Sequence, residues 1–205
     1  MDKHAAFSLL ELLVILVVLA FLIVLAFPIF NLGSDLSRQL RCASQLRGIG
    51  AAMAGYAVDH NGLVVYNVLA GESGTWEDGL LPYLLPGAKM VKGARPPGVF
   101  ACPSGTTLVQ SNHKSDYGKN LYINEKPEKV YRIVYRLVAV QPSSEVIFAG
   151  DAVARGIASP SLYEDGNLAA RHRGKANLLY FDGHVVAVSP AELPGVTGAL
   201  PWVPQ

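Results

Sequence analysis

The sequence predicts an α+β protein in which one long N-terminal helix packs on a C-terminal antiparallel β-sheet. The chain has no charged residue from Leu12 to Phe30, as is typical of a helix that spans a membrane. Apolar residues then recur at helical spacing from Leu36 to Met53. The rest of the chain contains short β-branched and aromatic runs between turn residues, which indicate strands.

The composition agrees with one globular body behind this apolar segment. Of the 205 residues, the roughly 170 that follow the apolar segment suffice for one domain with its own core. The chain carries 17 Lys and Arg against 16 Asp and Glu, so its net charge does not favour binding to a polyanion such as a nucleic acid. We therefore expect no nucleic-acid partner.

The apolar segment is long enough to cross a bilayer. As a helix that rises about 1.5 Å per residue, the nineteen residues from Leu12 to Phe30 cover about 28 Å. A cleaved secretory signal is disfavoured, because the segment is too long and its one small-residue site, at Ala26, is followed closely by Pro28. A plain anchor does not explain Glu11, since a carboxylate inside a membrane usually has a partner.

The residues from Ala6 to Glu11, AFSLLE, resemble the processing motif of type IV prepilins and type II secretion pseudopilins. The resemblance implies that a prepilin peptidase cuts between Ala6 and Phe7, methylates the new amine of Phe7 and leaves the apolar helix on the mature protein. The family usually has Gly before the cut, so Ala6 departs from its pattern.

The same resemblance implies a pilin-like fold and a division of the chain. Residues 1–6 would be a leader peptide, residues 7–30 a transmembrane and assembly helix, and residues 31–205 a globular domain. The chain would be a structural subunit of a type IV pilus or a type II secretion pseudopilus and not an enzyme. Its partners would be the prepilin peptidase, other pilin or pseudopilin subunits and inner-membrane lipid. The globular domain would lie in the periplasm or outside the cell after assembly.

Glu11 gains a partner if the helices of several subunits stack with a stagger. The amine freed at Phe7 is then a cation at the depth of a neighbouring subunit's Glu11. Such a pair sets the register of assembly more than it adds net stability, because desolvation cancels much of the Coulomb gain. Pro28 predicts a kink in the helix, although membrane helices also tolerate proline.

Cys42 and Cys102 are the only cysteines, and they are too few and too far apart for a zinc knuckle. In an oxidising compartment one disulfide would close a loop of about sixty residues and add about 4 kcal/mol in the chain-entropy model. Cys42 flanks the apolar stripe of the helix and Cys102 lies in a Cys-Pro loop, so the two could meet. Two separately buried thiols are the alternative.

The remaining elements follow from local signals. Asn61-Gly62 predicts the end of the long helix, and Thr75 to Asp78 predicts a capped short helix. Val130 to Val140 and Glu145 to Ala149 predict strands. Lys175 to Ser189 predicts a hairpin with a two-residue type I′ turn at its Asp-Gly pair.

His172, nine further residues and then Asp182-Gly183 resemble the C-terminal "H-X9-DG" segment of a large group of bacterial prepilin-type proteins. The resemblance supplies no biochemical role. From the residues themselves, we expect His172 to pin the entry to the hairpin through a backbone carbonyl or a carboxylate. Asp182 would accept hydrogen bonds within its own turn.

Metal binding is the alternative interpretation of this segment. His172, Asp182, His184 and Asp151 are ligand types that suit zinc or manganese, and residues 164–167 (EDGN) could contribute to a calcium loop. The alternative function is an uncleaved, membrane-tethered periplasmic binding or metal-dependent hydrolytic domain that uses His172, Asp182 and His184. No Ser or Cys nucleophile elbow accompanies these residues. We expect no other cofactor.

Overall fold

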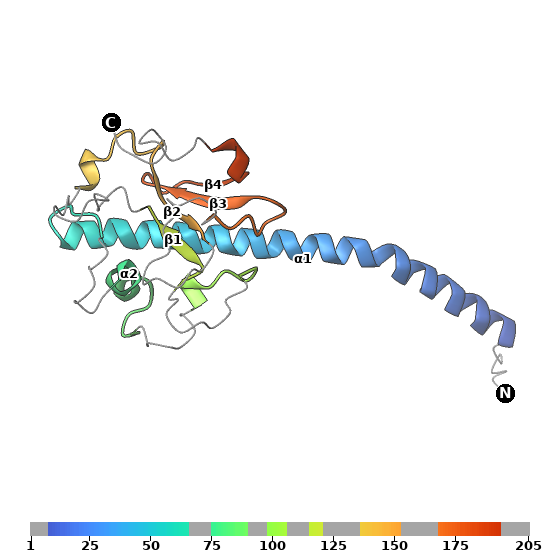
Figure 1. Cartoon of the computed structure of the whole chain (residues 1–205). Helices are drawn as coiled ribbons and strands as arrows, with labels where there is room; N and C mark the ends of the chain where they lie inside the picture. Colours follow the sequence, from blue (N-terminus) through green and yellow to red (C-terminus); the bar gives the residue numbers. More distant parts are fainter. Residues whose placement is uncertain are drawn as a thin grey trace. The chain divides into compact units, whose positions relative to one another are not determined.

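One helix, α1, runs from Leu9 to Asp59 (Figure 1). The computed structural model divides into two compact units, residues 1–37 and 38–205, and α1 contributes to both. The described residues are 8–65, 75–89, 98–105, 115–120, 136–152 and 168–193, apart from the side chains of residues 26–32 and 190.

The N-terminal unit holds the apolar part of α1. Every side chain from Ser8 to Leu25 is exposed. The Ser8 N–H donates to Oε2 of Glu11 over 2.9 Å, and the Glu11 N–H donates to Oγ of Ser8 over 3.2 Å. This reciprocal pair is a capping box, so Glu11 stabilises the first turn of its own helix.

Two predictions for this unit lie outside what the structure describes. The processing residues Ala6 and Phe7 precede the described chain, and Pro28 lies within α1 but belongs to the stretch whose side chains are not described. Among the described residues, no helix is both long enough and apolar enough to cross a membrane.

The C-terminal part of α1 carries the core of the second unit. Its buried face includes Ala43, Leu46, Ile49 and Met53, whereas Leu40 is exposed. The predicted stripe is therefore right from Ala43 onwards and wrong before it, because the body covers the helix only from about that point. The helix ends at Asp59, and Asn61 and Gly62 both have positive φ, at 55° and 79°. The predicted stop is confirmed.

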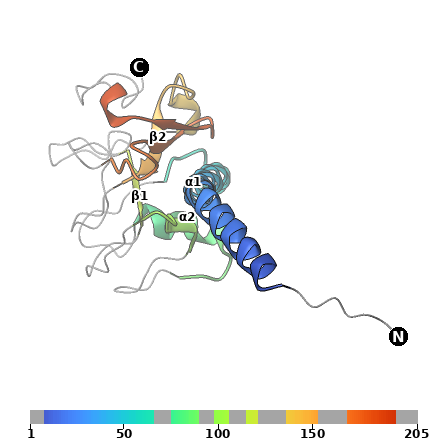
Figure 2. The ribbon, with the colours of Figure 1, turned by 90° about the vertical axis from the view of Figure 1, so that its right-hand side faces the viewer.

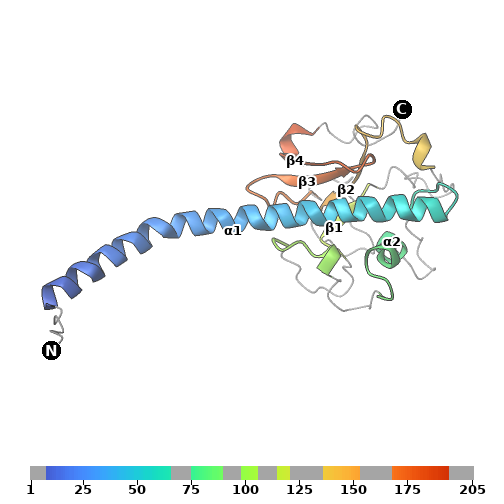
Figure 3. The same cartoon turned by 180° about the vertical axis from the view of Figure 1, so that it is seen from behind.

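The sheet consists of four antiparallel strands in the order β1-β2-β3-β4. Their bounds are Tyr117–Lys119, Ile147–Asp151, Ala176–Tyr180 and Val185–Val188. Within this unit, β3 and β4 lie on one side of α1 and the short helix α2, Trp76–Leu84, lies on the other (Figures 1 and 3). Viewed along α1, β2 and α2 also lie on opposite sides of it (Figure 2). The 3-10 turns are Gly98–Phe100, Leu137–Ala139 and Pro190–Glu192.

Aromatic rings connect these layers. Trp76, at the start of α2, packs edge-on against Phe100 and Phe148, with ring centroids 5.7 Å and 6.4 Å away. Phe148 of β2 in turn meets Phe181 at 5.2 Å. The predicted cap of α2 is confirmed, since the Thr75 N–H donates to the Asp78 carboxylate over 2.7 Å.

The strand predictions are partly right. Glu145 to Ala149 becomes β2, shifted by two residues. The described part of the other predicted strand is wrong, because Ala139 N–H donates to Arg136 and Val140 N–H to Leu137, which folds residues 137–139 into a 3-10 turn. Residues 130–135 lie outside the described chain.

The hairpin of β3 and β4 is confirmed, but its turn is not the predicted one. Tyr180 N–H donates to His184 O, and Gly183 N–H donates to Tyr180 O, each over 3.0 Å. Three residues, from Phe181 to Gly183, therefore connect the strands, and Gly183 takes the left-handed position with φ of 91°. Such three-residue loops end on a left-handed residue that glycine favours. Phe181, the first residue of this loop, is buried in the core.

Gly150 of β2 permits the close approach of β3. A Cβ at this position would lie 2.5 Å from Cδ2 of Leu178 and 2.8 Å from the backbone oxygen of Asn177. The Leu178 methyl group could move only within a packed interior, and the Asn177 oxygen cannot retreat without moving the backbone of the paired strand.

We expect Gly150→Ala to lower the free energy of unfolding by about 1 to 3 kcal/mol, as overpacking in a core does. Urea denaturation of the purified chain would measure this loss. The matched control is Gly98→Ala, since a Cβ at Gly98 meets nothing within 4 Å. Equal effects of the two substitutions would contradict the packing explanation.

Candidate functional site

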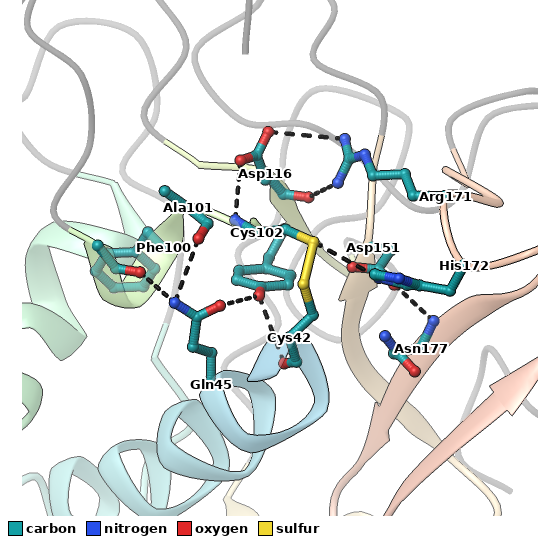
Figure 4. Close-up of a disulfide and its surroundings, with 12 residues drawn as sticks. Cys42, Gln45, Phe100, Ala101, Cys102, Asp116, Asp151, Arg171, His172 and Asn177 are labelled. Carbon is teal, nitrogen blue, oxygen red and sulfur yellow. Dashed lines mark hydrogen bonds and ion pairs between the residues drawn. A yellow bond between two sulfur atoms is a disulfide. The ribbon is translucent and has the colours of Figure 1, made fainter. Parts of the chain in front are cut away.

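A disulfide joins Cys42 of α1 to Cys102, with the two Cα atoms 5.2 Å apart and a sequence separation of 60 (Figure 4). Both cysteines are buried. Gln45, almost one helical turn after Cys42, donates to the backbone oxygens of Gly98 and Ala101, the latter over 3.2 Å. The segment that carries Cys102 is thus held against α1 by one covalent bond and by hydrogen bonds.

His172 lies beside this disulfide. Its Nε2 atom is 3.3 Å from Oδ2 of Asp151 and 3.5 Å from Sγ of Cys102. His172 and Asp151 are both almost completely buried. Oδ2 of Asp151 also accepts the backbone N–H of Asn177 over 2.7 Å. His172 therefore has a carboxylate partner at the entry to the hairpin, of the kind the sequence suggested.

The backbone turns sharply just after His172. His172 and Lys175 exchange two backbone hydrogen bonds, of 3.0 Å and 3.1 Å. The two residues between them, Arg173 and Gly174, have φ of 57° and 81°. Positive φ at both central residues is what a type I′ turn requires. A two-residue turn, which the sequence predicted at Asp182-Gly183, is thus found at Arg173-Gly174 instead. This turn directs the His172 side chain toward the interior.

The contacts of His172 do not form a proton relay. The carboxylate and the sulfur both approach Nε2, whereas in a nucleophile-His-Asp triad they contact opposite nitrogens of the ring. Nε2 faces Oδ2 of Asp151, and a carboxylate oxygen accepts hydrogen bonds, so we assign the ring proton to Nε2, which donates to Oδ2. The neighbouring sulfur belongs to a disulfide and cannot act as a nucleophile while oxidised.

Asp116 and Arg171 add a second set of buried contacts, and the sequence did not point to either residue. The Asp116 carboxylate accepts the backbone N–H of Cys102 over 2.9 Å. Arg171 donates through Nη1 to the backbone oxygen of Asp116 over 2.9 Å and through Nη2 to that of Ala152. Its Nη2 also lies 3.8 Å from Oδ1 of Asp116. Arg171 thus ties together the ends of β1 and β2. The only sequence signal was its position next to His172.

Tyr117 connects the first strand to the helix. Its hydroxyl donates to Oε1 of Gln45 over 2.8 Å, and the side chain is buried. Burial raises the pKa of Tyr117 well above its usual value, and the nearby carboxylates of Asp151 and Asp116 raise it further. The phenol is therefore neutral at every physiological pH and serves as a hydrogen-bond donor.

Asp182 and His184 lie at the other end of β3. Nδ1 of His184 is 2.5 Å from Oδ1 of Asp182, which also accepts the backbone N–H of His184 over 3.0 Å. Partial burial raises the pKa of Asp182, but the hydrogen bonds from His184 outweigh this and place the pKa below its usual value. Asp182 accepts bonds within its own turn, as the sequence suggested.

The four candidate metal ligands are therefore split into two pairs. His172 meets Asp151 at one end of β3, and Asp182 meets His184 at the other. The five residues of β3 span about 16 Å at 3.2–3.4 Å per residue. A site made from His172, Asp182 and His184 does not form, because one metal ion cannot reach both ends. The proposed calcium residues, 164–167, lie outside the described chain.

Comparisons with known proteins add no relative to this description. No family model, curated protein or solved structure matches the chain. The described structure defines an α+β protein with a long N-terminal helix, a four-stranded antiparallel sheet and a buried disulfide beside which Asp116, Asp151 and His172 lie.

We expect His172→Ala to lower the free energy of unfolding of the oxidised chain by roughly 1 to 3 kcal/mol, because Asp151 would keep its burial and lose its imidazole partner. The matched control is His184→Ala, which removes the other histidine of the segment. His184 is partly exposed beside Asp182, so its loss should cost less than about 1 kcal/mol. Urea denaturation of both variants would test this, and equal losses would contradict the structural role of His172.

Proposed function

We propose that the chain is a pilin-like structural subunit. A prepilin peptidase would cut it between Ala6 and Phe7 and methylate the amine of Phe7. The mature protein would remain in the inner membrane through its N-terminal helix and then assemble through that helix into a type IV pilus or a type II secretion pseudopilus. The proposal depends on the AFSLLE motif and is supported by the character of α1.

The observation that carries most weight is the exposed apolar surface at the start of α1. From Leu12 to Leu25 the helix presents only apolar side chains, and all of them are exposed. Monomeric soluble proteins rarely expose a continuous apolar surface of this extent. A helix that is apolar all round is stable only when lipid or other helices cover it. Membrane storage followed by helix-to-helix assembly would provide both kinds of cover.

Glu11 directly precedes this apolar stretch, and two roles are open to it. Its capping box with Ser8 stabilises the start of the helix. A carboxylate has two oxygens and several acceptor positions, so the bond from Ser8 still leaves it able to meet a cation. In the proposed assembly that cation is the methylated amine of Phe7 from a neighbouring subunit.

The disulfide in the globular body supports a location outside the cytoplasm. Disulfides persist in the periplasm and at the cell surface, whereas cytosolic thiols are kept reduced. The Cys42–Cys102 bond lies in the core of the second unit, next to a buried imidazole and a buried carboxylate. Among the described residues, the contacts of His172 bring neither a free nucleophile nor a second histidine to the site, which favours a structural role for His172 over the hydrolytic alternative.

We expect the mature chain to begin at methylated Phe7 when it is expressed together with a prepilin peptidase. Mass spectrometry of the intact protein would show this, with an inactive peptidase as the control that leaves Met1 in place. The variant Ala6→Gly restores the family's usual residue and should be cut at least as efficiently. An intact Met1, or a start beyond the apolar segment, in the presence of active peptidase would contradict the proposal.

Three substitutions separate the two roles of Glu11. Glu11→Ala removes both the cap and the charge, Glu11→Gln keeps a capping side chain without the charge, and Ser8→Ala weakens the cap by about 1 kcal/mol and keeps the charge. We expect both Glu11 variants to be cleaved and anchored but to enter filaments poorly, and Ser8→Ala to assemble. Quantifying each variant in sheared filaments would test this. Normal assembly of Glu11→Gln would contradict the ion pair.

A further inference from the structure

We propose that the reduced chain binds one zinc-like divalent metal ion through Cys42, Cys102, His172 and Asp151, and that formation of the disulfide expels the ion. This site differs from the one that the sequence suggested, because it uses the two cysteines and neither Asp182 nor His184. It does not depend on the proposed function.

His172 lies at the distances from a sulfur and a carboxylate oxygen that a tetrahedral zinc site requires. The two Sγ atoms and a ring nitrogen of His172 lie within 4.8 Å of one another. A tetrahedral zinc site with ordinary bond lengths needs about 3.6 Å between sulfur and nitrogen and about 3.4 Å between nitrogen and oxygen. The structure has 3.5 Å from Sγ of Cys102 to Nε2 of His172 and 3.3 Å from that nitrogen to Oδ2 of Asp151. Both distances from Nε2 are therefore close to those of a zinc site, whereas the two sulfurs have to separate and the Asp151 side chain has to adjust toward them.

The surroundings of the ligands also suit a metal ion. All four residues are buried, none with more than 3% of its surface exposed. The backbone N–H of Asn177 holds Oδ2 of Asp151 in place, which is the kind of outer contact that orients metal ligands. Among the described residues, the other oxygen, Oδ1, is buried without a hydrogen-bond partner. A cation beside this carboxylate would offset the cost of burying its charge.

The exchange between the two states balances in electrons and protons. A dithiol reductant gives two electrons and two protons to the disulfide, which becomes two thiols, while the reductant becomes a disulfide. The metal ion then displaces both thiol protons and binds Nε2 of His172 after the ring proton has moved to Nδ1. The sulfurs must separate to about 3.8 Å, the spacing of two thiolates on one zinc ion. Oxidation by a protein disulfide reverses these steps, and the ion leaves because thiolates, not disulfide sulfurs, are the metal ligands.

The test uses the full chain in detergent, reduced with a phosphine that leaves no competing thiol. Cobalt(II) is the probe, because thiolate-bound cobalt has intense charge-transfer absorption, and zinc should displace it. We expect one equivalent to bind to the reduced chain and none to the oxidised chain. Absence of these bands from the reduced chain, whether or not it remains folded by circular dichroism, would overturn the proposal.

A ligand variant with its control and an X-ray absorption measurement identify the ligands. His172→Ala should bind at least about tenfold more weakly, since even loss of an outer contact has that effect. His184→Ala is the matched control and should bind as the parent chain does. X-ray absorption of the zinc-loaded parent should show two sulfur ligands and at least one imidazole, a result that does not require any variant to fold. Equal binding by His172→Ala, or a shell of four sulfurs from two chains, would overturn the assignment.

Discussion

The bond between Cys42 and Cys102 places the first strand of the sheet. It fixes the segment 98–105 against α1, and the backbone N–H of Cys102 then binds the carboxylate of Asp116. Asp116 immediately precedes β1, whose first residue, Tyr117, donates back to Gln45 of the helix. A covalent bond and a hydrogen bond, almost one turn apart on α1, thus set where the sheet begins. The other strands follow by antiparallel pairing from β1 to β4.

The polar groups around the disulfide are buried, and their net contribution to stability depends on each of them having a partner. Removing one member of a buried pair leaves an uncompensated group, which costs more than the pair contributes. Arg171 and His172 are adjacent in sequence and act on adjacent elements, since Arg171 binds the backbone around β1 and β2 while His172 meets Asp151. The type I′ turn at Arg173-Gly174 lets both side chains reach inward before β3 begins.

The sequence predicted much of what depends on neighbouring residues, and among the contacts between distant residues it predicted the disulfide of Cys42 and Cys102. The helix stop at Asn61-Gly62 and the cap at Thr75 are local, and both were found. The capping box at Ser8 and Glu11 is equally local, and the serine three residues before a glutamate could have revealed it. The turn around Gly183 was misassigned because an Asp-Gly pair fits both a two-residue and a three-residue loop, and the hydrogen bond from Tyr180 N–H to His184 O shows that the loop has three residues.

At the candidate site, apart from the disulfide, the sequence identified residues but not which of them lie together. His172 and Asp151 were recognised as chemically capable, but their pairing depends on β2 and β3 lying side by side, which no local pattern specifies. The contact between α1 and the Cys102 segment is the long-range link on which the described body depends. Its most direct test is to alkylate free thiols in cells, recover the chain and map its peptides without reductant. The account predicts one linked pair containing Cys42 and Cys102, and quantitative alkylation of both thiols would contradict it.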